Sequence, residues 1–154
     1  MIRYRQATIK DVDDIFRLTN SHAKAGLMLP RSKYKIVNTI YCFYVAVDDS
    51  TGEVVGCGAL SPLWTDMAEI MALAVSDSYK RKGIGKTIVN ALIQRAREFG
   101  FPKVITLTYQ VEFFQKLGFT LTDKDNFPRK LWRECLECPK LEQCDENAMY
   151  IDLD

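Results

Sequence analysis

The residues best placed to do chemistry lie in one continuous segment, residues 73–86, which reads LAVSDSYKRKGIGK. An apolar stretch comes first, then a polar turn, then a basic loop with Gly83 and Gly85, and the pattern of a helix follows. A helix that begins after such a loop directs unpaired backbone N–H groups and the positive end of its dipole at one point. Because glycine has no Cβ, the backbone at Gly83 and Gly85 can come close to an anion. The segment therefore predicts a pyrophosphate-binding site.

Two common phosphate-binding motifs do not fit this segment. Gly85-Lys86-Thr87 matches the end of a P-loop, but the first glycine of that motif would fall at Lys80. The dinucleotide fingerprint requires a third glycine where the chain has Ile88. An exposed basic turn before an ordinary helix explains the charges, but it does not explain two glycines at this spacing.

The segment instead resembles the signature of the GNAT superfamily of N-acetyltransferases. That family carries R/Q-x-x-G-x-G/A between its fourth strand and the next helix, and residues 80–85 read KRKGIG, where Lys80 keeps the charge but not the planar fork of arginine. Residues 69–75 (EIMALAV) fit the family's preceding strand, and residues 113–119 (FFQKLGF) fit its later helix that ends in Gly-Phe. The resemblance implies that acetyl-CoA is the acetyl donor. It places the coenzyme against Leu73, Ala74, Val75, Lys80, Arg81, Lys82, Gly83, Ile84, Gly85, Lys86 and Phe114.

A closer resemblance is to the acetyltransferase domain of the N-acetylglutamate synthases, in a short stand-alone form. It rests on residues 29–32, 57–60, 68–70, 107–108 and 114–119. It implies that the acceptor is the α-amine of an amino acid, with L-glutamate as the expected one, as in the first step of arginine biosynthesis. The substrate contacts that it implies are Leu29, Arg31, Ser32 and Cys57, and Arg129 and Lys130 are candidates for the contact with a second carboxylate.

A dicarboxylate acceptor requires cationic contacts, which Arg31 and Lys130 would supply. Each is also open to the ordinary interpretation of an exposed surface charge. Two other functions remain open as well. One is acetylation of another small amine or of a protein N-terminus, and the other is a non-catalytic sensor of acyl-CoA.

The reaction requires a base, because an ammonium must lose a proton before its nitrogen attacks the thioester. Glu69 is the candidate, as an acid within an apolar strand whose burial would raise its pKa, although a buried acid satisfied by backbone groups is the alternative. Backbone N–H groups of residues 73–75 would stabilise the oxyanion. Many GNAT enzymes place a tyrosine where this chain has Phe114, so Tyr109 is the candidate acid, with ordinary aromatic packing as its alternative. Cys57 is no persuasive nucleophile, because the single histidine, His22, lies in the expected first helix.

Three of the five cysteines, Cys135, Cys138 and Cys144, lie close together near the C-terminus. Their spacing is compatible with a zinc or iron–sulfur site, but three thiolates do not complete a tetrahedral set and no histidine is near. Reduced thiols packed against the sheet are the favoured interpretation of this Cys-containing segment, at about residues 127–147.

The elements that must position these residues follow from hydrophobic periodicity. We expect strands at 2–6, 42–47, 53–60, 68–75, 104–108, 119–122 and 148–153, with a turn at 62–66. We expect helices from about 8 to 24, from near 32, at 84–99 and at 111–117. Strands interleaved with helices after an antiparallel beginning predict an α/β (α+β) fold. The GNAT resemblance implies a mixed, mostly antiparallel central sheet flanked by helices.

Composition limits the remaining possibilities. At 154 residues the chain has the length of one domain, 1–154. A net charge of +1 argues against a nucleic-acid partner, and no apolar run reaches the length of a membrane span. With no signal-peptide pattern, we expect a cytoplasmic protein. The sequence leaves open whether it is a monomer or a homodimer.

Overall fold

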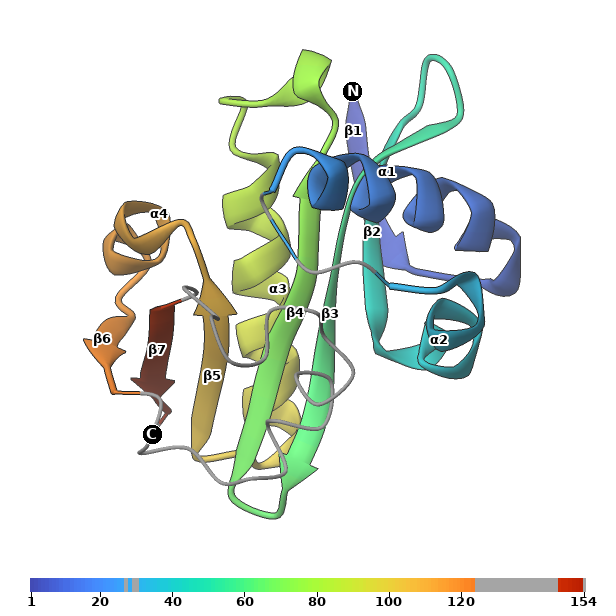
Figure 1. The fold of residues 1–154 in the computed structure, drawn as a ribbon. Coiled ribbons are helices and arrows are strands. Elements are labelled where there is room, and N and C mark those ends of the chain that lie inside the picture. The colour runs from blue at the N-terminus through green and yellow to red at the C-terminus, as the bar shows by residue number, and fades with distance from the viewer. Residues whose placement is uncertain (27, 29–30, 124–146, 154) are drawn as a thin grey trace.

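The structure is a computed structural model of the chain, and it describes residues 1–26, 28, 31–123 and 147–153. Its described part contains one seven-stranded sheet in the order β1-β2-β3-β4-β5-β7-β6 (Figure 1). Neighbouring strands are antiparallel except β4 and β5, which are parallel. The strands are β1 (Ile2–Gln6), β2 (Phe43–Asp48), β3 (Glu53–Trp64), β4 (Met67–Val75), β5 (Lys103–Thr108), β6 (Thr120–Thr122) and β7 (Asn147–Asp152). The fold is thus the mixed, mostly antiparallel sheet with flanking helices that the sequence predicts.

Helices cover both faces of the sheet. Two of them, α1 (Val12–Lys24) and α2 (Lys33–Asn38), lie on one face, where Ile15 and Ile36 pack against Phe43 of β2. On the other face lies α3 (Ile84–Phe99), and the short α4 (Val111–Lys116) adds Phe114 to the same apolar cluster. Figure 1 shows α1 and α3 on opposite sides of β3 and β4. In the described part of the chain no helix is long and apolar enough to cross a membrane.

Two glycines in β3 bring α3 close to the sheet. A Cβ added at Gly56 would meet Ile84 Cγ2 at 2.9 Å, and one at Gly58 would meet Ile88 Cγ2 at 2.8 Å. Distances this short are not sustained between carbon atoms, so α3 can pack at this depth only over residues without side chains. The N-terminus of α3 is therefore fixed against the middle of the sheet, beside the end of β4.

The parallel pair β4 and β5 separates along its length. Backbone pairing is confined to Ala68 with Val104 and Glu69 with Ile105, and beyond it the Thr106 hydroxyl donates to the Ile70 carbonyl at 2.9 Å. Ala72, at φ +56°, introduces an irregularity into β4 at this level. The two strands then diverge, as Figure 1 shows. This divergence opens the sheet next to the start of α3.

Most element boundaries agree with the sequence prediction to within one or two residues, and the β3–β4 connection is the main exception. A turn was expected at 62–66, but β3 continues to Trp64 and Pro62 pairs with Ala68. Among the described residues the pairing of β3 with β2 ends at Ala59, so at Pro62 the strand has a described neighbour on one side only, and proline is tolerated there.

Candidate active site

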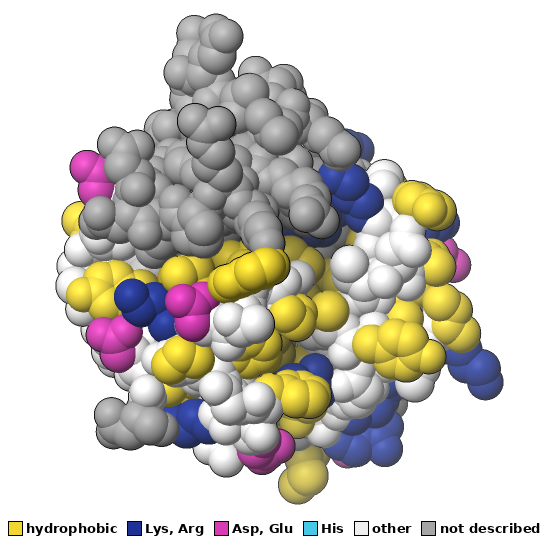
Figure 2. Space-filling view, turned by 90° about the horizontal axis from the view of Figure 1, so that it is seen from below, with side chains coloured by type: hydrophobic (Ala, Val, Ile, Leu, Met, Phe, Trp, Pro, Cys, Tyr) yellow, Lys and Arg dark blue, Asp and Glu magenta, His cyan; other side chains and the backbone are white. Residues whose placement is uncertain are grey.

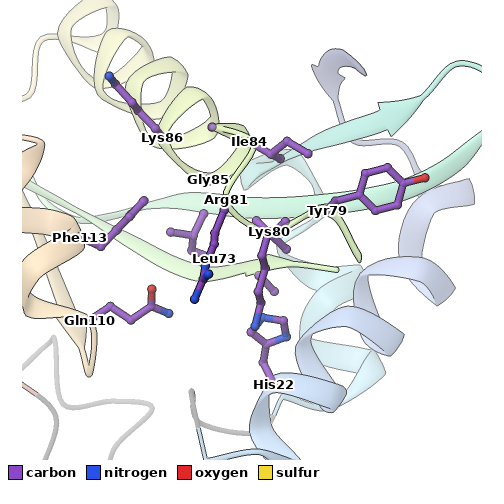
Figure 3. Close-up of a pocket in the computed structure, with 13 residues that line it drawn as sticks. His22, Leu73, Tyr79, Lys80, Arg81, Ile84, Gly85, Lys86, Gln110 and Phe113 are labelled. Atoms are coloured by element: carbon purple, nitrogen blue, oxygen red, sulfur yellow. The ribbon is translucent and has the colours of Figure 1, made fainter. Parts of the chain in front are cut away.

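A cavity of about 440 Å³ opens where β4 ends and α3 begins. Nine of the eleven residues expected to contact the coenzyme line it (Figure 3). They are Leu73, Ala74, Val75, Lys80, Arg81, Gly83, Ile84, Gly85 and Lys86. The segment that reads as an anion site in the sequence therefore forms the wall of a real cavity.

The loop before α3 contains two residues in the left-handed region. Gly83, the N-cap of α3, adopts φ +79°, and Arg81 adopts φ +66°. The left-handed region is accessible to glycine without strain, whereas a side chain costs roughly 1–2 kcal/mol there. The first turn of α3 contains no acidic residue to neutralise its dipole. The N–H groups at this helix start can therefore serve an external anion.

Gly85 has a different role from Gly83. Its backbone is an ordinary part of α3, but an added Cβ would lie 3.4 Å from Phe113 Cζ and 3.8 Å from Val75 Cγ2. Both contacts belong to residues that line the cavity. Gly85 thus keeps the cavity wide at the first turn of the helix.

The cationic side chains of the loop are not equivalent. Lys80, Arg81 and Lys86 line the cavity, and Lys80 Nζ lies 2.9 Å from Asp77 Oδ1. Lys82 is not among the lining residues, and its Nζ lies 5.3 Å from the ring centroid of Tyr79. A cation in this position is attracted to the ring face, outside the cavity. The sequence prediction of a coenzyme contact by Lys82 has no counterpart in the described cavity.

A hydrogen bond from another hairpin holds the loop in place. The Tyr79 hydroxyl, at the end of the 3₁₀ turn η3 (Asp77–Tyr79), donates to Asp48 Oδ2 at 2.6 Å. Ser50 donates to the other oxygen of Asp48 through its backbone and its side chain. These hydrogen bonds lower the pKa of Asp48 to about 2, and the bond from Tyr79 has the largest effect. The end of β2 therefore anchors the segment that leads into the cavity wall.

Four lining residues were not expected from the sequence, namely His22, Tyr79, Gln110 and Phe113. Phe113 precedes the expected Phe114, and the two rings meet edge to face with centroids 5.1 Å apart. Phe114 itself is buried at 3% exposure. It lines a second, smaller cavity. His22 and Gln110 come from elements far from the glycine loop, and no local pattern indicates their place.

The second cavity, of about 40 Å³, lies between the diverging strands. Its walls come from β4 (Ile70, Met71, Ala72, Leu73), β5 (Thr106, Leu107, Thr108) and Met28, Gln110 and Phe114. Leu73 and Gln110 line both cavities. The larger cavity therefore reaches the separation of β4 and β5.

Glu69 lies on β4 between Ala68 and Ile70, which both pack on the α3 side. Because side chains alternate along a strand, Glu69 faces the side of α1 and α2. It is half-buried, not enclosed as expected, and it is not among the residues that line the two cavities. Tyr109 is also half-buried and outside both linings.

Cys57 lies in β3 on the same side as Glu69, fully buried among apolar residues. Its thiol donates to the Ala72 carbonyl at 3.4 Å, and burial raises its pKa to about 12. Such a thiol is inert, as its lack of a histidine partner indicates. The positive charge of Arg31 lowers the pKa of this thiol, against the effect of burial, so Arg31 lies near this part of β3.

The remaining predicted substrate residues divide into two groups. Arg31 is half-buried, and Ser32 caps α2 by accepting a hydrogen bond from the Lys35 N–H at 3.1 Å. Leu29, Arg129 and Lys130 lie outside the described residues, as do Cys135, Cys138 and Cys144. Among the residues that are described, no group of three His, Cys, Asp or Glu side chains could hold a metal ion.

Comparison with known proteins identifies the fold that carries this cavity. Residues 9–119 match the acetyltransferase (GNAT) family, which is more than half of the chain. The chain belongs to the GNAT family. This membership confirms the resemblance seen in the sequence, the acyltransferase activity and acetyl-CoA as the acetyl donor.

Individual GNAT relatives extend the similarity over the whole chain. An uncharacterised N-acetyltransferase of Chlorobaculum tepidum is 39% identical over 149 residues, covering 97% of this chain and 95% of that protein. An amino-acid acetyltransferase of Mycobacterium tuberculosis is 38% identical over 117 residues, covering 75% of this chain and 67% of that protein.

Solved GNAT structures show the same arrangement. N-acetylglutamate synthase of Neisseria gonorrhoeae, complexed with coenzyme A and N-acetyl-glutamate, superposes with a TM-score of 0.88 at 25% identity. The superposition covers all of this chain but 35% of that protein. A Mycobacterium tuberculosis protein in complex with CoA and NLQ gives a TM-score of 0.85 at 30% identity and covers 99% of both chains.

Figure 2 shows how charge is distributed on one face of the molecule. Lys and Arg side chains occur there at several separate places among hydrophobic and acidic ones. This distribution agrees with the net charge of +1.

Proposed function

We propose that this protein transfers the acetyl group of acetyl-CoA to the α-amine of an amino acid, and that the acceptor is L-glutamate. The observation that carries the proposal is the 440 Å³ cavity, which begins at the anion-binding start of α3 and reaches the separation of β4 from β5. In this proposal the diphosphate of the coenzyme lies against residues 80–86, and its thioester lies beside Leu73. The product would enter arginine biosynthesis.

Three observations support L-glutamate as the acceptor. The N. gonorrhoeae relative is complexed with N-acetyl-glutamate, and the M. tuberculosis relative is an amino-acid acetyltransferase. In this chain, Arg31 lies on the α1–α2 side of the sheet near Cys57, the side that Glu69 faces. A guanidinium there can form paired hydrogen bonds with a carboxylate. Lys130 stays a candidate for the second carboxylate.

Glu69 is proposed as the base. It accepts a proton from the ammonium of the acceptor, directly or through one water molecule, and the freed nitrogen lone pair attacks the thioester carbonyl carbon. The half-buried position of the carboxylate agrees with this role, because the group keeps access to the acceptor side. The C–N bond forms first, which gives a tetrahedral intermediate, and the C–S bond breaks as that intermediate collapses. The second proton on the nitrogen passes to the departing thiolate, and Glu69 returns its proton to the solvent.

The β4 backbone is proposed to stabilise the oxyanion. Past Glu69 the strand no longer pairs with β5, so N–H groups near Leu73 can point into the separation. The coenzyme leaves as a thiolate, and a thiol of ordinary pKa, about 8.5, leaves without full protonation. Tyr109 remains the candidate proton donor.

The direct test is release of coenzyme A from acetyl-CoA in the presence of each amino acid in turn, followed by mass analysis of the product. We expect turnover with L-glutamate and formation of its N-acetyl derivative. Turnover of another amine alone would overturn the acceptor assignment. Arg31→Gln should raise the KM for glutamate, with Lys10→Gln, the loss of an exposed cation, as the matched control.

A non-catalytic sensor would behave differently. It would bind acetyl-CoA with no turnover of any amine, and Glu69→Gln would change nothing. An enzyme acting on another amine or on a protein N-terminus would be insensitive to Arg31→Gln.

A further inference from the structure

His22 is a buried titratable group that the proposed mechanism does not use. It lies in the last turn of α1 at 6% exposure and lines the larger cavity. Figure 3 shows its imidazole directed toward the cavity, close to the end of the Lys80 side chain and on the opposite side from α3. Its position places a ring nitrogen where a bound coenzyme would pass.

The hydrogen bonding of the ring determines which nitrogen faces the ligand. Nδ1 lies 3.1 Å from the Leu18 carbonyl oxygen, which can only accept a hydrogen bond, so Nδ1 carries a hydrogen. In the neutral ring Nε2 is then the unprotonated nitrogen. Within the described part of the chain Nε2 has no hydrogen-bond partner. A buried polar atom without a partner is unfavourable, and a ligand can supply that partner.

The charged groups near His22 lie in the turn after β4, and they are Asp77, Lys80 and Arg81. Lys86 of α3 also lines the cavity, but its side chain points away from His22 (Figure 3), and Gln110, between β5 and α4, is neutral. Burial and then the positive charge of Lys80 lower the pKa of His22, while the Leu18 carbonyl and Asp77 act in the opposite direction. Burial and Lys80 therefore favour the neutral form of the ring in the free protein.

A phosphate changes this balance. Its ionised oxygens only accept hydrogen bonds, so a neutral Nε2 cannot bind them, whereas a protonated Nε2 can donate. An anion beside Lys80 and Arg81 also offsets the positive charge that disfavours a protonated ring.

We propose that His22 is a coenzyme-binding residue, whose Nε2 donates a hydrogen bond to a phosphate oxygen of the bound coenzyme from the α1 side of the cavity. The inference rests on the proposed placement of the coenzyme against residues 80–86. Nε2 takes the required proton from the solvent when the coenzyme binds and returns it when the coenzyme leaves. Binding and protonation are therefore linked: coenzyme affinity falls as the pH rises above the pKa that His22 has in the free protein, and it levels off above the higher pKa that His22 has in the complex.

The test is isothermal titration calorimetry of acetyl-CoA lacking its 3′-phosphate, at pH 7, in buffers of different ionisation enthalpy. The 3′-phosphate is omitted because a phosphate monoester titrates at about pH 6 and would add its own protons. We expect the wild-type protein to take up a substantial fraction of one proton per ligand bound.

Two variants separate the hydrogen bond to the phosphate from the uptake of a proton. In His22→Gln the neutral side-chain amide can donate the hydrogen bond, so binding should persist without proton uptake. In His22→Ala both the hydrogen bond and the proton uptake are lost, and the affinity for the coenzyme should fall about tenfold. Proton uptake that persists in His22→Gln, or unchanged affinity in His22→Ala with the fold intact by circular dichroism, overturns the inference. A fall in kcat with unchanged affinity also overturns it, because it would assign the ring to proton transfer with the substrate.

A third variant tests separately whether the coenzyme lies in this cavity. Gly85→Val, which fills the opposite wall, should weaken binding if the coenzyme lies in this cavity. If Gly85→Val binds the ligand unchanged, the placement is wrong whatever His22 does. If Gly85→Val weakens binding and the His22 variants do not, only the role of His22 is wrong.

Discussion

The coenzyme side and the acceptor side of the proposed site are built in different ways. Nine coenzyme-side residues come from one stretch of 14 residues, 73–86, and all line one cavity. The acceptor-side candidates, Arg31, Ser32, Cys57 and Glu69, come from separate segments, and none lines either cavity described. A local segment can thus define a phosphate site by itself, because a loop and a helix start supply the donors. A site for an amino acid depends on how distant elements meet.

The largest effect expected is on the acceptor side. Glu69→Gln removes the proposed base, and general base catalysis typically contributes about a hundredfold to ten-thousandfold in rate. We expect kcat to fall by about a hundredfold or more while the Kd for acetyl-CoA is unchanged. Steady-state kinetics and calorimetry measure the two quantities. Glu98→Gln, an exposed acid near the end of α3, is the matched control. A parallel loss of coenzyme affinity would show that the two sides are not separable.

Arg31→Gln, also on the acceptor side, should change the KM for glutamate and not kcat. A hydrogen bond between charged groups contributes roughly 1.5–3 kcal/mol, which corresponds to about a tenfold to hundredfold rise in the KM for glutamate. The KM for acetyl-CoA should stay constant. Initial rates at varied glutamate test this, and an unchanged KM for glutamate would remove Arg31 from the site.

Gly85→Val tests the coenzyme side alone. The new side chain extends toward Phe113 and Val75 into the cavity, so we expect the KM for acetyl-CoA to rise about tenfold. Stability should be retained, because glycine is the poorer helix former at this position by a few tenths of a kcal/mol. Gly85→Ala should give a smaller rise in the KM. Thermal unfolding and kinetics of the pair decide the point, and a raised KM for glutamate instead would contradict the division of the site.

The smallest effect concerns the anchor of the coenzyme loop. The bond from Tyr79 is the largest cause of the low Asp48 pKa, about 2 against 3.8 for the unperturbed group. Between these values the unfolded chain binds more protons than the folded one, so the stabilisation by this pair is complete above about pH 4 and is lost toward pH 2. Tyr79→Phe should therefore be less stable than the wild type at pH 6, with the difference shrinking as the pH falls. Urea unfolding across this range measures it, and a difference that does not vary with pH would rule out the Asp48 bond as its source.

The same contrast explains what the sequence could predict. The start and end of α3 follow from local pattern, and the structure has them as expected. The cation–π contact that takes Lys82 out of the cavity lining, and the choice of Phe113 over Phe114, depend on rotations that spacing does not specify.

Tertiary placement accounts for the other differences. In the sequence His22 has significance only as a potential partner for Cys57, yet α1 brings it to the coenzyme cavity, although it is 51 residues from Leu73 in sequence. Glu69 was expected to be enclosed because its neighbours are apolar. It is half-buried because strand alternation turns it to the side of α1 and α2.

The most direct test of the account is hydrogen–deuterium exchange of the whole protein with and without acetyl-CoA. The account predicts that exchange slows most in residues 73–86, where the N–H groups at the start of α3 receive the diphosphate, with a further decrease at the end of α1. Protection that leaves residues 80–86 unchanged would contradict it.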